Sequence, residues 1–270
     1  MSEKNQKFLQ AAKKEITEHK IKFFVYLTLR FFVIVSLVLS LLRNEYENAF
    51  VCILCLVLFL VPTFLEKRLK IDLPSTVEII ILLFIFSAEI LGEIHNYYAK
   101  VPYWDTILHV MNGFLFSAFG FSLLDIMNRN SKFKFELSPL YLTLVAFCFS
   151  MTIGVLWEFF EFGCDVLLGT DMQKDFIMNT ISSVKLNPDG ENVPVIIKNI
   201  RQFSVNGKDL GLNGYLDIGL YDTMKDLIVN FLGAAIFSII GFFYIKNRGK
   251  GDFAKQFIPV IEEDKDKDNK

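Results

Sequence analysis

Residues 23–42 read FFVYLTLRFFVIVSLVLSLL, an apolar run interrupted by one charge, Arg30. A helix rises 1.5 Å per residue, so this run is long enough to cross the ~30 Å hydrocarbon core of a bilayer. The Arg30 side chain can extend to the nearer interface. Because the run and the charged leader before it are both longer than those of a signal peptide, the stretch predicts a retained membrane-spanning helix.

The same pattern recurs along the whole chain. Apolar residue types make up 53% of the 270 residues, and 29 residues are Phe, which is more apolar surface than the core of a soluble domain requires. Long apolar runs predict five further spans, at residues 49–65, 76–91, 106–127, 140–162 and 227–245. The expected fold class is therefore an all-α polytopic membrane protein with six transmembrane helices.

The distribution of Lys and Arg sets the expected orientation. Basic residues gather in the leader, in the loops after the second and fourth spans, and in the C-terminal tail, whereas the other short loops hold only Arg43 and Lys100. Because cytoplasmic loops are enriched in Lys and Arg, both termini are expected in the cytoplasm of a multi-pass cell-membrane protein. This divides the chain into a basic cytoplasmic leader (1–22), a six-helix membrane domain (23–246) and a charged cytoplasmic tail (247–270).

The segment between the fifth and sixth predicted spans is the largest one outside them. It contains β-branched runs broken by the dipeptides Asn206-Gly207 and Asn213-Gly214. Asn-Gly favours two-residue hairpin turns with positive φ. Residues 171–221 are therefore expected to form a small β-rich insertion on the extracytoplasmic side, too short to be an independent domain with a large core.

Charge and cysteine content argue against several function classes. The formal net charge of −2 gives no electrostatic case for nucleic acid as a partner. Cys52 and Cys55 have the Cys-x-x-Cys spacing, but their neighbours are Val, Ile and Leu, and no second pair follows. We interpret them, with Cys148 and Cys164, as small apolar packing residues rather than as a redox or zinc site. The lipid bilayer is the partner that composition indicates, and protein partners stay open.

Ionisable residues gather at one end of the predicted spans. At the start of the fourth span, Asp105 and His109 are four residues apart and share a helical face. The other clusters are Glu89, Glu93 and His95 at the end of the third span, Glu158, Glu161 and Asp165 at the end of the fifth, and Asp222 and Asp226, with the polar Asn230, at the start of the sixth. Charged groups within spans usually face the bundle interior and mark function. With the orientation above, they predict one polar pocket that faces outward.

Several carboxylates can share such a pocket only if they are protonated, paired with cations or bound to a metal ion. Two like charges 4 Å apart repel by roughly 4 kcal/mol at an effective dielectric constant of ~20, and His109, Lys174 and Lys225 are too few to balance the acids. Carboxylates with one imidazole suit a divalent metal ion such as Mg²⁺, Mn²⁺ or Zn²⁺. The predicted ligands are Asp105, His109, Glu158 and Asp226. With Glu161 or Asp222 as general base, this pocket predicts a metal-assisted hydrolase or transferase that acts on a lipid headgroup.

The same residues allow other interpretations. Acids near helix ends can be solvated or can cap their helices, as Asp105 and Asp222 would, and Trp104 and Trp157 fit an aromatic belt at the membrane surface. A transporter of a cation or small amine needs a polar path across the membrane, and the cytoplasmic halves of the spans hold few ionisable residues. A non-catalytic envelope interaction protein would bind its partner through the insertion at 171–221. A lipid or a small molecule remains the expected ligand of the pocket.

Several motifs resemble those of a known family. They are Trp104-Asp105-x-x-x-His109-x-x-x-Gly113-Phe114, Trp157-Glu158, Leu168-Gly169-Thr170, and Asp222-x-x-x-Asp226 with Gly233-Ala234. Together they resemble the YjdF-like inner-membrane family, and more distantly the VanZ-like group. The resemblance covers about half the chain, from Asp105 to Ala235, and implies a shared site without implying a particular chemistry. This chain differs from the YjdF-like pattern in the insertion at 171–221.

Overall fold

The structure is a computed structural model and describes residues 20–69, 71–129, 137–247 and 252–261. These residues form mainly helices, together with short antiparallel strand pairs. Five helices are long and apolar enough to cross a membrane: Lys20–Leu42, Tyr46–Arg68, Trp104–Asn128, Pro139–Leu168 and Leu220–Lys246. The prediction of a helical, multi-spanning protein is thus confirmed, whereas the count of six is not. Most of the predicted leader, and the tail from residue 262 on, lie outside the described residues.

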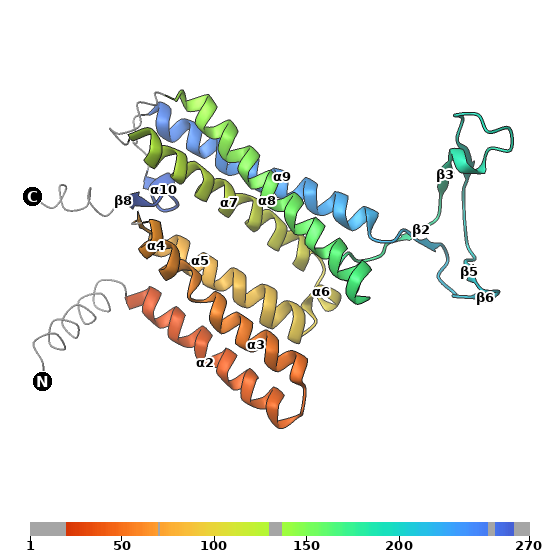
Figure 1. Cartoon of the computed structure of the whole chain (residues 1–270), viewed down its shortest axis with the longest axis horizontal. Coiled ribbons are helices and arrows are strands. Elements are labelled where there is room, and N and C mark those ends of the chain that lie inside the picture. Colours follow the sequence, from red (N-terminus) through yellow and green to blue (C-terminus); the bar gives the residue numbers. More distant parts are fainter. Residues whose placement is uncertain (1–19, 70, 130–136, 248–251, 262–270) are drawn as a thin grey trace, which may run out of the picture. The chain divides into compact units, whose positions relative to one another are not determined.

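Helices α2 (Lys20–Leu42), α3 (Tyr46–Leu58) and α5 (Ser75–Phe86) pack against one another (Figure 1). Their common core consists of apolar side chains, and Cys52 and Cys55 lie within it with no exposed surface. Both thiols are free. Their surroundings agree with the interpretation that the Cys-x-x-Cys spacing here serves packing.

The second predicted span contains a break. Helix α3 ends at Leu58, and α4 (Val61–Leu69) begins after an interruption at Phe59 and Leu60. Pro62 lies in the first turn of α4, where a missing N–H costs no helical hydrogen bond. A helix that continued from α3 through this position would be broken by the proline ring and the missing N–H. Proline at this position therefore explains why one apolar run forms two helices.

The third predicted span, residues 76–91, changes helix type part-way. Helix α5 ends at Phe86 and continues directly as a π-helix, η1 (Ser87–Ile94), which is followed by the short helix α6 (Tyr97–Lys100). Neither α5 nor η1 alone is long enough to count as a span, which is why this one is not among the five. π-Helical turns are rare in proteins, and many of those that occur lie at functional sites.

Three long helices form the other part of the bundle: α7 (Trp104–Arg129), α8 (Pro139–Leu168) and α9 (Leu220–Lys246). Helix α8 continues past the predicted end at residue 162, and α9 begins before the predicted start at residue 227. Acidic residues in these end turns lower the hydropathy that defined the predicted spans. The helical spacing of those residues is nevertheless unbroken.

The chain divides into two compact units. The first consists of Met1–Met151 with Asn230–Lys270, and the second of Thr152–Val229. The boundary falls inside α8 and inside α9, and each of these helices continues through it without interruption.

In the first unit, α7 and α9 touch at two glycines. A Cβ atom on Gly113 would lie 2.1 Å from the carbonyl oxygen of Asn230, and a Cβ on Gly233 would lie 2.0 Å from that of Val110. Only glycine permits so close an approach of two backbones. Helix α8 joins the contact through Ser150, whose hydroxyl donates to the Gly113 carbonyl at 2.7 Å.

Polar side chains on both sides of this crossing fix the direction of the two helices. Asn112 Nδ2 donates to Asn230 Oδ1 at 3.2 Å, and the hydroxyls of Ser117 and Ser238 lie 3.1 Å apart. Both pairs advance together along the chain, so the 230–246 part of α9 runs in the same direction as α7. The three predicted neighbours are therefore in contact in the first unit.

Beyond the crossing, the interior of the first unit is aromatic. The ring of Phe114 meets Phe237 and Phe257 edge-on, with centroids 5.2 and 5.0 Å apart, and Phe121 meets Phe237 at 5.8 Å. Phe121 and Phe237 have no exposed surface. These four residues, called the aromatic cluster below, fill the space between α7 and α9 with offset ring contacts.

The segment after α9 folds back onto the bundle. Helix α10 (Asp252–Lys255) leads to Phe257 and then to β8 (Val260–Ile261) (Figure 1). Strand β8 pairs antiparallel with β1 (Ile71–Asp72). Phe257 is 8% exposed. The composition of residues 247–270 predicts a charged tail, whereas Phe257 within this stretch packs on the bundle.

The second unit contains three antiparallel strand pairs. They are β2 (Ile177–Met178) with β7 (Tyr215–Leu216), β3 (Ile181–Ser183) with β4 (Val195–Ile197), and β5 (Ser204–Val205) with β6 (Lys208–Asp209). A single 3₁₀ turn, η2 (Val184–Leu186), follows β3. Small antiparallel strand pairs are thus present between α8 and α9.

One of the two Asn-Gly steps makes the predicted hairpin. Asn206 and Gly207 join β5 to β6 with φ values of 52° and 78°, the positive pair that a type I′ turn requires. The step Asn213-Gly214 does not: the strand after it, β7, pairs with the distant β2. The local preference of Asn-Gly for hairpin turns therefore predicts the pairing of β5 with β6, but it cannot predict the long-range pairing of β2 with β7.

Candidate metal site

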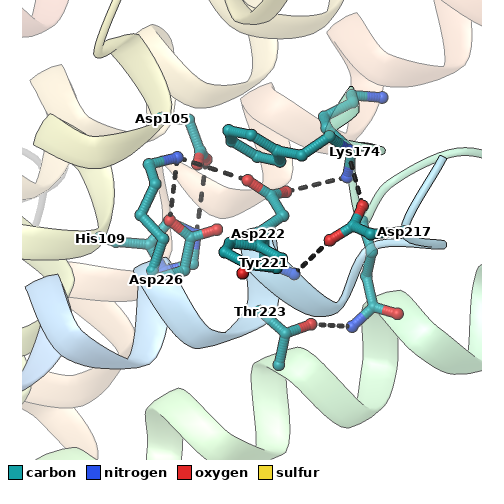
Figure 2. Close-up of polar contacts among 11 residues, drawn as sticks. Asp105, His109, Lys174, Asp217, Tyr221, Asp222, Thr223 and Asp226 are labelled. Atoms are coloured by element: carbon teal, nitrogen blue, oxygen red, sulfur yellow. Dashed lines mark hydrogen bonds and ion pairs between the residues drawn. The ribbon is translucent and has the colours of Figure 1, made fainter. Parts of the chain in front are cut away.

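Asp105 and His109 lie side by side in the first turns of α7. His109 Nε2 is 3.4 Å from Asp105 Oδ1 (Figure 2). The imidazole side chain is 9% exposed and the carboxylate side chain 29%. The four-residue spacing brings them together as the sequence predicts. One carboxylate and one imidazole are therefore adjacent on a single helix.

Two buried acids follow the inward face of α8 in the second unit. Glu158 and Glu161 are 4% and 9% exposed, whereas Phe159 and Phe160 are more than half exposed. The indole Nε1 of Trp157 donates to Glu161 Oε1 at 2.9 Å. Both acids thus lie on the side of α8 that faces protein, and Trp157 fixes the direction of one of them.

The start of α9 carries a second pair of acids with a lysine between them. Asp222 is 5% exposed and Asp226 2%. The ammonium Nζ of Lys225 lies 3.3 Å from Asp222 Oδ1 and 3.5 Å from Asp226 Oδ1. The other oxygen of Asp222 accepts the backbone N–H of Lys174 at 2.9 Å (Figure 2). Both oxygens of Asp222 therefore already have donors.

The loop after α8 is fastened by Asp165. This carboxylate accepts from the backbone N–H groups of Met172 and Gln173, at 2.6 and 2.9 Å, and from the hydroxyl of Thr170 at 2.7 Å. A carboxylate with three donors is held in one orientation. The sequence spacing predicts that Asp165 shares one helical face with Glu158. In the structure, the Asp165 carboxylate anchors the loop after α8.

Asp217 fastens the other end of the same loop. Its two oxygens accept from the backbone N–H groups of Phe176 and Tyr221, each at 2.7 Å (Figure 2). Gln173 also donates to the hydroxyl of Thr223 at 2.6 Å. Residues 170–176, called the strap below, are thereby fixed to the first turn of α9.

One strap residue has a perturbed acidity. Burial, and then the nearby Asp171 and Asp217 carboxylates, raise the pKa of Asp175 above its ordinary value of 3.8, and a hydrogen bond from the Gly219 N–H works in the opposite direction. The strap is therefore a region where negative charges crowd.

An Asp/His/Asp group that could hold a metal ion is present among the described residues: Asp105, His109 and Asp226. These are three of the four predicted ligands. The fourth, Glu158, is buried on α8 but is not a member of this group. The ligand role of all four, and the role of Glu161 or Asp222 as base, stay predictions.

Two features of this region escaped the sequence analysis. One is the amide pair of Asn112 and Asn230, whose signal was an Asn one turn from an ionisable residue on each helix. The other is Lys225, which the sequence presents only as a nearby cation. Its position three residues after Asp222 and next to Asp226 was the available signal.

The fold and these residues define a class: multi-spanning helical membrane proteins with buried acidic and imidazole groups on their helices. The chain belongs to the family described as "Predicted membrane protein (DUF2238)", whose model matches residues 24–247. This confirms the resemblance to the YjdF-like family. As a membrane protein, the chain resides in a lipid bilayer.

One further comparison adds no named activity. A protein of Thermotoga maritima, described as "Uncharacterized protein", is 30% identical over 107 residues, which cover 40% of this chain and 53% of the relative. The match thus spans about half the length of that curated relative. No solved structure matches this chain.

Proposed function

We propose that this protein is a membrane enzyme that binds a divalent metal ion at Asp105, His109 and Asp226 and catalyses hydrolysis or group transfer on a lipid headgroup. The Asp/His/Asp group is the observation that carries the proposal. Two carboxylates and an imidazole suit Mg²⁺, Mn²⁺ or Zn²⁺. Such an ion, when bound, supplies Lewis-acid activation and charge neutralisation.

Contacts one helical turn away support this ligand set. Asn112 on α7 donates to Asn230 on α9 within the first unit. His109 precedes Asn112 by three residues, and Asp226 precedes Asn230 by four, each in an unbroken helix. Residues three or four apart share a helical face. His109 therefore lies in the same row of side chains as Asn112 on α7, and Asp226 lies in the same row as Asn230 on α9.

The surrounding residues favour particular roles for the other acids. Glu158 is the proposed fourth ligand because it is a buried carboxylate on the inward face of α8. Glu161 is the better candidate for the general base. Both oxygens of Asp222 are already engaged, one by the Lys225 ammonium and the other by the Lys174 N–H, so Asp222 could accept a proton only by giving up one of these contacts.

The other halves of the same helices support an enzyme over a transporter. A transported cation needs polar groups along its whole path. Past the Gly113–Gly233 crossing, the contact between α7 and α9 retains the Ser117–Ser238 pair and is then filled by the aromatic cluster. The buried acidic and imidazole groups of α7 and α9 thus lie at one end of the helices, apart from Asp125 near the other end of α7.

A lipid substrate agrees with the residues that flank the acids. Trp157 and Phe160 on α8, and Tyr221 and Met224 on α9, are 45–53% exposed. In a bilayer, exposed apolar side chains on spanning helices meet lipid. A headgroup can therefore approach from the side while its acyl chains remain in contact with these residues.

We infer two further features of the topology. Helix α5 and η1 follow each other without a break, which supports a sixth span at Ser75–Ile94. The distribution of Lys and Arg supports cytoplasmic termini, with the acidic residues and the insertion at 171–221 on the opposite side.

Metal binding by the purified full-length chain in detergent tests the ligand set. We expect the wild type to bind about one Mn²⁺ per chain, measured by electron paramagnetic resonance. His109→Ala and Asp226→Asn should each reduce binding to background. Asp125→Asn is the matched control, because Asp125 is a buried acid near the other end of α7. Equal, near-zero Mn²⁺ in wild type and variants would refute the ligand set.

Activity is tested separately on liposomes. Released headgroups, identified by mass spectrometry, should appear with wild type plus Mn²⁺ and should be reduced by orders of magnitude in Glu161→Gln, since removal of a general base typically costs 10²–10⁴-fold. Mn²⁺ binding without any headgroup release would retain the metal site and reject the reaction.

A further inference from the structure

Lys225 is in an unusual position for a lysine on a membrane helix. Its ammonium lies between two carboxylates that are nearly inaccessible, at 3.3 Å from Asp222 and 3.5 Å from Asp226. The Lys225 side chain itself is 35% exposed. It also lies over the ring of Phe176, 5.8 Å from the centroid.

The two carboxylates need this cation. Removing one partner from a buried charge group leaves uncompensated charge, which is strongly destabilising. Asp222 and Asp226 are one helical turn apart, and like charges at this spacing repel. Without Lys225, some other cation from solution would have to neutralise the pair.

The neighbouring residues hold the pair ready for a cation. The Lys174 N–H fixes one oxygen of Asp222 and leaves its Oδ1 directed to Lys225. Asp226 is also a member of the Asp/His/Asp group. Asp226 is therefore common to the proposed ligand set and to the pair of carboxylates that Lys225 contacts.

We propose that Lys225 is the built-in second cation of this site and fixes its capacity at one divalent metal ion. The Lys225 ammonium occupies the position between Asp222 and Asp226 that a second divalent ion would otherwise take. This inference deepens the proposed function, since it rests on a metal ion at Asp226 as the first cation. Many metalloenzymes activate their substrates with two metal ions about 3.5–4 Å apart, and here a lysine takes the place of one.

Metal stoichiometry tests the role of Lys225. Full-length protein in detergent is titrated with Mn²⁺, and bound ions are counted by electron paramagnetic resonance. Lys225→Met removes the charge and keeps the length of the side chain, so it should bind one Mn²⁺ more than the wild type. Lys225→Arg retains a cation and should bind the same number as the wild type.

A double variant supplies the matched control. Lys225→Met combined with Asp222→Asn removes one cation and one anion together, so the extra Mn²⁺ should be lost again. Lys225→Met alone should also unfold at a lower temperature in EDTA and regain the loss in Mn²⁺. The double variant should need no such rescue.

The outcomes separate this inference from the proposed function. A folded Lys225→Met variant that binds the same number of ions as the wild type overturns the inference. The inference is also overturned if neither Lys225→Met nor the double variant folds in the presence of Mn²⁺. Folding of Lys225→Met only in the presence of Mn²⁺ supports it. If the wild type binds no Mn²⁺ but Lys225→Met gains one, the proposed ligand set and the capacity of one ion both fail, and only the exclusion of a metal ion from the Asp222–Asp226 pair by Lys225 is retained.

Discussion

The two halves of α7 bury different chemistry. Before Gly113, the helix directs Asp105, His109 and Asn112 into the protein. After Gly113 it directs mainly aromatic rings such as Phe114 and Phe121, with one buried acid, Asp125, near its end. Helix α9 changes in the same way within the first unit, from Asn230 to Phe237. The glycine crossing marks the change on both helices.

The difference shows how a helix pair in a membrane divides its tasks. Lipid is as apolar as a helix surface, so close packing and hydrogen bonds, rather than the hydrophobic effect, hold such helices together. In the aromatic half, stability comes from ring contacts and backbone proximity. In the polar half, the same helices can carry groups whose burial costs free energy. We therefore expect substitutions in the two halves to separate stability from metal binding.

The largest loss of stability is expected from Phe237→Ala. Phe237 has no exposed surface and contacts two other rings, and truncation of a buried Phe typically costs about 3–5 kcal/mol. Thermal or denaturant unfolding in detergent measures the loss, and Mn²⁺ binding should persist in the fraction that remains folded. Phe243→Ala on the same helix is the control, because Phe243 is 52% exposed. Similar losses in both variants would mean that the aromatic cluster has no special role.

The crossing itself should be the next most sensitive position. In Gly113→Ala, the new methyl group would lie 2.1 Å from the Asn230 carbonyl oxygen, so the two helices must separate. Overpacking of this kind costs roughly 1–3 kcal/mol. Unlike Phe237→Ala, it should also weaken Mn²⁺ binding, because separation displaces one row of ligands from the other.

Gly163→Ala provides the matched control for this glycine. A Cβ on Gly163 meets nothing within 4 Å, and alanine is a better helix former than glycine. Unfolding of this variant should show no loss. A Gly113→Ala variant as stable as Gly163→Ala would show that the backbones are not in close contact.

A smaller effect is expected from the amide pair that borders the polar half. Asn112→Ala, Asn230→Ala and the double variant form a cycle whose coupling free energy should be about 0.6–1.7 kcal/mol, the range measured for hydrogen bonds between membrane helices. Unfolding free energies in bicelles give the coupling. Strictly additive losses would show that the 3.2 Å hydrogen bond contributes nothing.

How much of this the sequence predicted differs between the two halves. The spacing of Asp105 and His109 predicted their contact, because residues four apart must share a helix face. The aromatic cluster was not predicted. Its member Phe257 lies in a charged C-terminal stretch, and no local pattern indicates that this segment returns to pack on α7 and α9. Local periodicity fixes which face a residue takes, while contacts between distant segments depend on the whole fold.

The same limit applies at the ends of the helices. Hydropathy ended the fifth predicted span at residue 162 because the following turn contains Asp165. In the structure α8 continues to Leu168 because Asp165 is satisfied by N–H groups of the strap. Similarly, the change from α5 to the π-helix η1 has no counterpart in apolar periodicity. Hydrogen bonds to a later loop cannot be read from the composition of a span.

The smallest predicted effect concerns the strap. The raised pKa of Asp175 means that the folded strap opposes ionisation of this carboxyl. The ionised Asp175 carboxyl therefore destabilises the folded strap. This effect is absent below 3.8, the pKa of Asp175 in the unfolded chain, grows as the pH rises through the higher pKa of the folded state, and is constant above that pKa. Asp175→Asn should remove this pH dependence and keep an oxygen that accepts from the Gly219 N–H. The ratio of amide exchange rates in the variant and the wild type at Gln173 and Lys174, whose N–H groups are bonded in the strap and do not follow residue 175, cancels the intrinsic effect of pH. We expect this ratio to be near one at pH 3 and below one at pH 7, because negative charge loosens the wild-type strap. A ratio that does not change with pH would mean that crowding of carboxylates at the strap has no effect on its stability.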